Sequence, residues 1–278
     1  MRISVFSDEI DRRDPVRAIR LAASWGVEWV EVRTVVSGRF PNVPDREIEE
    51  LAARLRDAGV GVSGVSPGLF KCAVDDPSVP EALAGDLPRA CAWARRLGTD
   101  RVSCFGFARQ GGDQVPQQVE DRLAQMARTT AEHGCRLSLE NEAGCWGGTG
   151  LEAAAIIRRV GATTMGLCWD PGNAVRAGSA SAYPEEYRQV ADLVAHVHAK
   201  NFDPQNGRWS LIETGVVDWP GQLRALAADR YAGFVVVETH LDISPDEFRV
   251  VDPDLDALSA NTLRNLEFVR SCLAAGSG

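Results

Sequence analysis

Acidic and histidine side chains follow short apolar segments of the chain, and they are the groups best able to do chemistry. The segments end in Glu140-Asn141-Glu142, in Asp170, in His196 to Lys200, and in Glu238-Thr239-His240. A carboxylate at such a position is costly to desolvate unless a cation or hydrogen bonds compensate it. Several carboxylates meeting at one place therefore predict a bound cation. Oxygen ligands with one imidazole suit one divalent ion, Mn²⁺ by expectation, with Mg²⁺, Co²⁺ or Zn²⁺ as alternatives.

The spacing of these residues narrows the ligand assignments. Residues two apart on a strand face the same side but differ in height by about 6.6 Å, so only one of each pair can reach the ion. We take His198 as the ligand, because it is the more C-terminal of two histidines, and expect His196 to be a hydrogen-bonded core residue. Glu140 ends the apolar run Leu-Ser-Leu, whereas Glu142 lies further out and is equally compatible with a place on the rim.

Eight apolar runs rich in β-branched residues alternate with amphipathic stretches, which is typical of parallel strands joined by helices. Eight such units predict a single (β/α)₈ TIM barrel over residues 1–278, with a frayed tail at the last few residues. The predicted strands are 2–6, 28–33, 60–65, 100–105, 135–140, 164–169, 194–199 and 233–238.

The long connections all follow strands, which locates the chemistry. Helices end in glycine and lead into the next strand within about two residues, as tight connections do. The stretches 67–78, 106–115, 201–217 and 239–252 instead follow strands. In a barrel these loops form the face where catalytic groups gather. Glu31 and Arg33 lie at the same end of the second strand, where we expect an internal salt bridge between them.

Composition excludes several classes of function. The formal net charge of −9 and pI near 5.1 disfavour binding to nucleic acid or to an anionic membrane. The seven cysteines have no CxxC spacing, which argues against a disulfide framework and favours a reducing cytoplasm. The start MRISVFSDEI lacks the apolar region of a signal peptide, and no segment reaches the length of a membrane helix. A small polar substrate fits best, and a homo-oligomer is compatible with these features.

Four segments together resemble one known superfamily. The segments LSLENE, CWDPGN, HVHAKN and VVVETH are similar to those of xylose isomerase-like TIM barrels. This superfamily holds sugar isomerases, ketose 3-epimerases, inosose dehydratases and endonuclease IV. The resemblance implies a metal site formed by Glu140, Asp170, His198 and Glu238.

The resemblance also implies a reaction. A divalent ion would polarise a sugar carbonyl, and Glu140 and Glu238 would remove and return a carbon-bound proton through an enediolate. The chain departs from the ketose 3-epimerases at Asn173, where those enzymes often have histidine. It also departs at Cys104-Phe105-Gly106 and at Glu213-Thr214-Gly215. These departures leave the identity of the sugar open.

Several further residues are candidates for binding the substrate. Lys200 and His240 could contact it or stabilise negative charge, with an ion pair and a cap on the rim as the alternatives. Asn173 can hydrogen-bond a hydroxyl group. The remaining candidates are Arg33, Glu142 and the aromatic residues Trp146 and Trp169, for which ordinary packing is the alternative.

Three other functions compete with a metal-dependent sugar isomerase or epimerase. The same site could act as a dehydratase or lyase on a keto-inositol or keto-sugar, because proton removal can end in loss of a β-hydroxyl. A catalytically silent sugar-binding barrel would keep the pocket without the reaction. A nuclease like endonuclease IV needs many histidines, and the chain has 4.

Residues 59–64 match GxGxxG by letter, but they precede a strand instead of opening a helix, which excludes a dinucleotide site.

Overall fold

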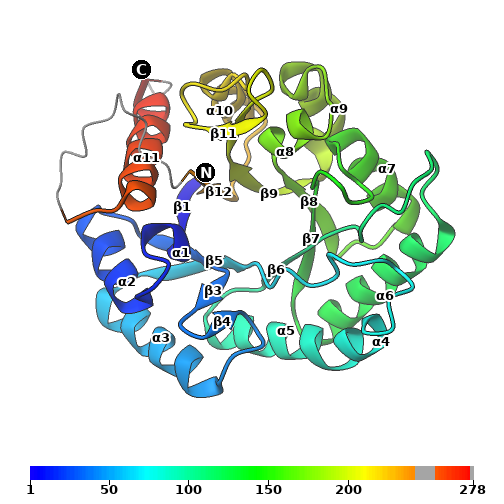
Figure 1. Cartoon of the computed structure of the whole chain (residues 1–278), viewed down its shortest axis with the longest axis horizontal. Coiled ribbons are helices and arrows are strands. Elements are labelled where there is room, and N and C mark those ends of the chain that lie inside the picture. The colour runs from blue at the N-terminus through cyan, green and yellow to red at the C-terminus, as the bar shows by residue number, and fades with distance from the viewer. Residues whose placement is uncertain (242–253, 276–278) are drawn as a thin grey trace.

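The computed structural model describes residues 1–241 and 254–275. Eight parallel strands close into a barrel in the order β1-β12-β9-β8-β7-β6-β5-β2 (Figure 1). They are β1 (Arg2–Phe6), β2 (Trp29–Val32), β5 (Gly61–Val65), β6 (Arg101–Cys104), β7 (Arg136–Glu140), β8 (Met165–Trp169), β9 (Val194–Ala199) and β12 (Phe234–Val237). Every predicted strand is present, with ends that differ by one residue at most. The predicted TIM barrel is confirmed.

Helices surround the barrel, as Figure 1 shows. Asp14 begins the first long helix by accepting hydrogen bonds from the backbone N–H groups of Val16 and Arg17. Gly59 ends the next long helix with a φ of +67°, a conformation that favours glycine. The long helices are α2 (Pro15–Ser24), α3 (Asp45–Ala58), α5 (Leu87–Arg96), α6 (Gln117–Glu132), α7 (Gly150–Val160), α10 (Trp219–Ala228) and α11 (Ala257–Ala275). The short ones are α1 (Ser7–Ile10), α4 (Val79–Glu81), α8 (Pro171–Arg176) and α9 (Tyr187–Val190), with helical turns η1 (Ala82–Asp86), η2 (Ala182–Glu186) and η3 (Ala191–Leu193).

The apolar core and the barrel interior have different compositions. The main apolar cluster contains alternate strand residues together with buried residues of the helices. Phe6, Phe234 and Val236 form a separate small cluster. Buried polar groups also pair between the strands, as where the hydroxyls of Ser4 and Ser63 lie 2.7 Å apart. The barrel interior therefore holds hydrogen-bonding groups beneath the candidate site.

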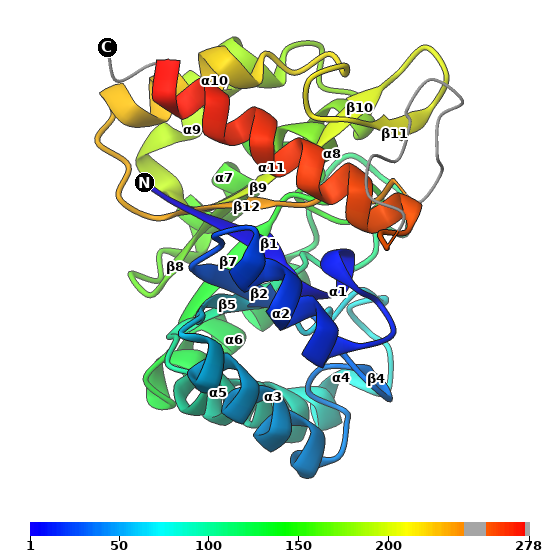
Figure 2. The same ribbon diagram turned by 90° about the vertical axis from the view of Figure 1, so that its left-hand side faces the viewer.

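The connections that follow strands lie together on one face. Two of them contain hairpins, β3 (Thr34–Val35) with β4 (Gly38–Arg39), and β10 (Asn201–Asp203) with β11 (Arg208–Ser210). Figure 2 places α1, β4 and the β10–β11 hairpin on the same side, opposite the N-terminus. This is the face predicted from the long loops. Most of the predicted loop 239–252 lies outside the described residues.

Two predictions made from composition can be compared with the described residues. All seven cysteines are free, as predicted. Among the helices in residues 1–241 and 254–275, none combines the length and apolar character needed to cross a membrane.

Candidate metal centre

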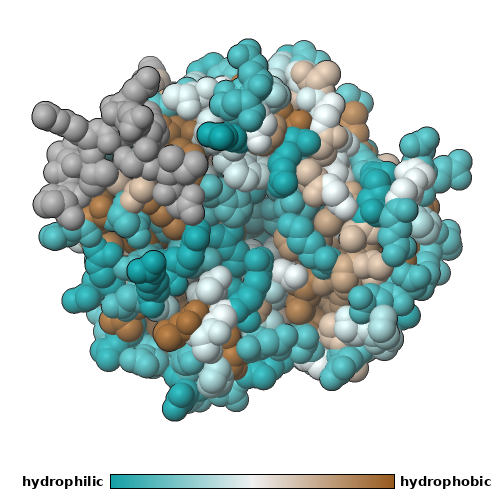
Figure 3. Space-filling view, in the orientation of Figure 1, coloured by the Kyte–Doolittle hydropathy of each residue, from teal (hydrophilic) through white to brown (hydrophobic). Residues whose placement is uncertain are grey.

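Four buried side chains converge where neighbouring strands end. Glu140, Asp170, His198 and Glu238 end or follow β7, β8, β9 and β12, which are adjacent around the barrel. One potential ligand atom from each lies within 4.8 Å of the others. Figure 3 shows a hollow lined by hydrophilic residues at the centre of the barrel. The four residues predicted to hold a metal are thus brought together.

Asp170 presents one oxygen to the cluster because its other oxygen is used locally. Oδ1 accepts a hydrogen bond of 2.8 Å from the backbone N–H of Asn173 and so caps α8. Oδ2 is buried without a hydrogen-bond partner and lies 3.0 Å from Nζ of Lys200. Gly172 permits the close approach of α8 to β9, since a Cβ there would lie 2.8 Å from the backbone oxygen of Lys200.

His198 directs one ring nitrogen at the cluster. Its Nδ1 has no hydrogen-bond partner and lies 3.3 Å from Oε1 of Glu140 and 3.4 Å from Oε2 of Glu238. The Phe6 ring meets the imidazole edge to face at a centroid distance of 5.1 Å. The imidazole therefore packs against Phe6 and directs Nδ1 at the two glutamates.

These residues fit a divalent metal ion. Around an ion with bonds of about 2.1 Å, adjacent donor atoms lie about 3.0 to 3.4 Å apart. The distances from His198 to the two glutamates fall in this range. Oδ2 of Asp170 and Nδ1 of His198, which are the atoms that would ligate, are both buried without a hydrogen-bond partner. Three carboxylates and one imidazole suit a hard or borderline divalent ion.

The site's electrostatics differ from one carboxylate to another. Burial raises the pKa of Asp170 to about 7, against the lowering effect of Lys200 and with a further rise from Glu238 and Glu140. Burial also acts to raise the pKa of Glu238, but Lys200 and His240 outweigh it and hold that pKa well below its usual range. Burial also acts to raise the pKa of Glu140, but His198 outweighs it and lowers that pKa.

Arg33 and Glu31 do not form the predicted salt bridge. The Arg33 guanidinium lies 3.0 Å from Oδ2 of Asp8, 3.0 Å from Oε1 of Glu9 and 2.8 Å from Oε1 of Glu238. Glu31 instead contacts the two histidines of β9. Arg33 lies beyond the end of β2, so its long side chain reaches across to the segments that follow β1 and β12. The hydrogen-bonded core role predicted for His196 is confirmed, since Nε2 lies 2.6 Å from Glu31.

Lys200 and His240 both contact Glu238. The buried Lys200 Nζ lies 3.1 Å from Oε2 of Glu238, so the ion-pair alternative is present in the structure. His240 lies 2.8 Å from Oε1 of Glu238 through Nε2 and 3.0 Å from Glu9 through Nδ1. Burial alone would lower the pKa of His240, but Glu238 and Glu9 raise it to about 9.

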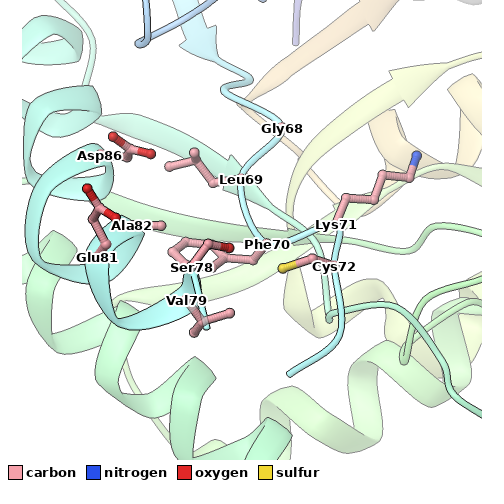
Figure 4. Close-up of a pocket in the computed structure, with 10 residues that line it drawn as sticks. All are labelled: Gly68, Leu69, Phe70, Lys71, Cys72, Ser78, Val79, Glu81, Ala82 and Asp86. Carbon is pink, nitrogen blue, oxygen red and sulfur yellow. The ribbon is translucent and has the colours of Figure 1, made fainter. Parts of the chain in front are cut away.

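Glu142 is buried next to the metal cluster. Asn173 connects the two, because its Nδ2 lies 3.1 Å from Glu140 and 3.4 Å from Glu142. Lys71 and Arg176 approach Glu142 to 3.1 and 3.7 Å. In Figure 4 the Lys71 side chain extends away from the other residues lining a cavity of about 330 Å³. None of the four predicted ligands lines this cavity.

The two tryptophans predicted to wall the pocket differ in their surroundings. Trp169 does not face the site: its ring packs at Gly150, and its indole nitrogen donates a 2.9 Å hydrogen bond to Gln222 of α10. Its strand neighbours Cys168 and Asp170 face inward, so alternation directs Trp169 into the helix layer. Trp146 is buried in a loop, with the guanidinium carbon of Arg109 4.2 Å from its ring centroid. Packing, the alternative reading, describes both.

Sequence reasoning missed several polar groups around the cluster. Asp8 and Glu9 follow the first strand and both bind Arg33, and neither of them was assigned a role from the sequence. Arg39 donates hydrogen bonds to the backbone oxygens of Ser66 and Pro67. The signal available for Asp8 and Glu9 was their position, because they follow the strand that pairs with β12.

Comparisons with known proteins agree with this architecture. The sequence pattern of the family described as xylose isomerase-like TIM barrel matches residues 19–270. A search of curated proteins found no match.

Three solved structures illustrate the similarity of the fold. An L-ribulose 3-epimerase has a TM-score of 0.76 and 21% identity, covering 99% of this chain and 95% of its own. A xylose isomerase-like TIM barrel protein from Mycobacterium smegmatis, in complex with magnesium, has a TM-score of 0.69 and 22% identity, covering 95% of this chain and 89% of its own. A probable 3-DHS dehydratase from Bacillus anthracis has a TM-score of 0.72 and 13% identity, covering 96% and 99%. With the family pattern matched along most of its length, the chain belongs to the xylose isomerase-like TIM barrel family.

Proposed function

We propose that the protein is a divalent-metal-dependent isomerase or epimerase of a small sugar or sugar-like keto substrate. The observation that carries the proposal is the convergence of Glu140, Asp170, His198 and Glu238 within 4.8 Å at four adjacent strand ends. Two of the four atoms that would ligate are buried without a hydrogen-bond partner. Such atoms are costly to bury unless a ligand compensates them. We propose Mn²⁺ as the native ion.

The chemistry needs a cation and two positioned bases. A bound divalent ion supplies Lewis-acid stabilisation of the negative charge that develops on substrate oxygens when a carbon-bound proton leaves. Glu140 takes this proton, and Glu238, after taking up a proton from solvent water, delivers that proton to the other side of the substrate. Asn173 donates a hydrogen bond to Glu140, while Arg33 and His240 hold Glu238. These contacts orient the bases, which is the geometric requirement for proton transfer on two faces of one carbon.

Several side chains around the cluster supply contacts for a small hydroxylated substrate. Asn173 and Glu142 lie on the Glu140 side, and His240 and Arg33 lie on the Glu238 side. The buried Lys200 carries a positive charge beside Asp170 and Glu238, where it stabilises negative charge on the substrate. We retain these five residues as substrate contacts, with Trp146 as a loop residue nearby in sequence to Glu142.

A dehydratase or lyase is the second candidate, and one feature of the site favours it. Removal of a β-hydroxyl needs a proton donor as well as a base. His240, with its ring nitrogen 2.8 Å from Glu238, is partly exposed and able to donate a proton. Glu140 could therefore remove the first proton in either reaction, and the product formed from the substrate distinguishes the two reactions.

The deciding experiment uses purified protein with Mn²⁺, Mg²⁺, Co²⁺ or Zn²⁺ and a panel of ketoses, aldoses and inososes in heavy water. Deuterium entering carbon without loss of mass supports the isomerase or epimerase. Loss of water from the substrate supports the dehydratase. If every substrate binds without exchange or loss of water, the protein is a silent sugar-binding barrel and the proposal is wrong. A chelated sample provides the control for metal dependence.

A further inference from the structure

Glu31 lies in the barrel interior below the candidate metal centre, where it joins three hydrogen-bonding groups. Its side chain is about 1% exposed. Oε2 lies 2.6 Å from Nε2 of His196, whereas Oε1 lies 3.3 Å from Nε2 of His198 and 2.5 Å from Oγ of Ser66. The Ser66 hydroxyl in turn lies 2.8 Å from that of Ser103. Glu31 is thus held from several directions.

The two ring nitrogens of His198 face different surroundings. Nε2 points at Glu31, while Nδ1 points at Glu140 and Glu238 and has no hydrogen-bond partner. A neutral imidazole carries its proton on one nitrogen and a lone pair on the other. Because an ionised carboxylate can only accept, Glu31 favours the tautomer with the proton on Nε2 and leaves the Nδ1 lone pair for an ion.

We propose that Glu31 is a positioning residue that makes Nδ1 of His198 the metal-ligating nitrogen. This inference rests on the proposed metal site and adds an atom-level requirement to it. A carboxylate that accepts the second N–H of a ligating histidine fixes both the tautomer and the orientation of its ring. Phe6 supports the same orientation, because its ring lies edge to face with the imidazole at 5.1 Å.

A second metal ion between Glu31, His196 and His198 is the competing explanation of this cluster. Their potential ligand atoms also lie within 4.8 Å of one another. The contact from His196 to Glu31, however, is 2.6 Å, which is a hydrogen-bond length. Two ligands of one ion with bonds of about 2.1 Å would lie about 3.0 Å or more apart. The spacing therefore favours an orienting carboxylate, with the ion placed on the opposite side of His198.

The wild-type protein allows a direct test that needs no substitution. With ¹⁵N-labelled histidine and diamagnetic Zn²⁺ bound, a long-range ¹H–¹⁵N spectrum distinguishes metal-bound from protonated ring nitrogens. We expect His198 to show a metal-bound Nδ1 and a protonated Nε2. Ligation through Nε2 would overturn the inference while leaving a metal-dependent reaction intact. Failure of Zn²⁺ and Mn²⁺ to bind at all would contradict both this inference and the proposed function.

Substitution of Glu31 then measures how much this residue contributes to metal affinity. Glu31→Gln keeps the size of the side chain but leaves one acceptor oxygen for two histidines. We expect Mn²⁺ affinity, measured calorimetrically, to fall about 10- to 100-fold, as loss of such a partner typically does. Ser66→Ala is the matched control, since it removes a donor to the same carboxylate without touching His198; its affinity should stay within about threefold.

The unfolding midpoint of the metal-free protein separates positioning from a merely structural role. For Glu31→Gln we expect a loss of Mn²⁺ affinity that is larger than the loss of stability of the metal-free protein can account for. We also expect a second His198 tautomer in the spectrum. Unchanged affinity and a single Nδ1-ligated form in Glu31→Gln would contradict the positioning role. Metal binding through Nδ1 without turnover on any substrate would support the inference and count against the proposed enzymatic function.

Discussion

The two glutamates proposed as bases occupy contrasting surroundings on opposite sides of the metal cluster. Glu238 is surrounded by basic side chains: Arg33 at 2.8 Å and His240 at 2.8 Å from Oε1, and Lys200 at 3.1 Å from Oε2. On the other side, Glu140 accepts a 3.1 Å hydrogen bond from the Asn173 amide. Among the described residues its ion-pair contact is with His198, which the two glutamates share.

This difference separates two demands on a carboxylate. Charge-assisted hydrogen bonds stabilise the ionised form strongly and hold its geometry, but they also make it a weaker base. A neutral amide orients a carboxylate with a smaller effect on its basicity. We infer that Glu140 is the residue that first takes the proton, whereas Glu238 is held mainly as a ligand and acts when the proton is returned.

Glu140→Gln tests the strongest consequence of this comparison. At saturating Mn²⁺ we expect the rate of deuterium exchange into an identified substrate to fall by about 10²- to 10⁴-fold, the usual contribution of a positioned base. Glu142→Gln is the matched control, because it makes the same change two residues along the chain and is expected to act mainly on KM. Full turnover by Glu140→Gln would remove Glu140 from the catalytic assignment.

Arg33→Met tests the other side of the site. The substitution retains an apolar stem but leaves Asp8, Glu9 and Glu238 without their shared guanidinium. Breaking a buried ion pair from one side typically costs about 3–5 kcal/mol, which denaturant unfolding of the metal-free protein would measure.

Arg39→Met is its control, since Arg39 is exposed and donates hydrogen bonds to backbone carbonyl groups of Ser66 and Pro67. A change below about 1 kcal/mol is expected there. Equal effects of the two substitutions would show that Arg33 has no special role in holding Glu238.

The sequence predicts one part of this site well and another part poorly, for a physical reason. Strand periodicity and the ends of apolar runs locate Glu140, Asp170, His198 and Glu238, because each lies where its own strand ends. The partners of Arg33 could not be predicted in this way, because they follow other strands. Barrel closure places β1 between β12 and β2, and the length of the Arg33 side chain then allows contacts with Asp8, Glu9 and Glu238.

Trp169 and His240 differ in how far the sequence could have predicted their positions. Alternation along β8 already directs Trp169 away from Asp170, so its orientation could have been predicted from the strand pattern. The position of His240 depends on a backbone with φ of +50°, which is uncommon for a residue other than glycine. Local sequence gives no clear signal for that turn, and the contact from His240 to Glu9 depends on it.

Asn173→Ala sharpens the comparison by removing the amide that orients Glu140. Hydrogen bonds to charged groups contribute about 1.5–3 kcal/mol, so we expect turnover to fall about 10- to 100-fold. Because the main-chain N–H of residue 173 is kept, the helix cap from Asp170 should persist and Mn²⁺ affinity should change little. A large loss of affinity with little loss of turnover would show that Asn173 supports the metal site instead of the base.

His240→Gln has the smallest expected effect, because Glu238 keeps Arg33 and Lys200 as partners. Glutamine can still donate one hydrogen bond but carries no charge. A net loss of about 1 kcal/mol corresponds to roughly a fivefold fall in turnover, measured with the same deuterium exchange assay. A fall in turnover as large as that of Glu140→Gln would contradict the contrast between the two glutamates. Such a result would indicate that His240 itself transfers a proton. It would then favour the reaction that removes a hydroxyl group.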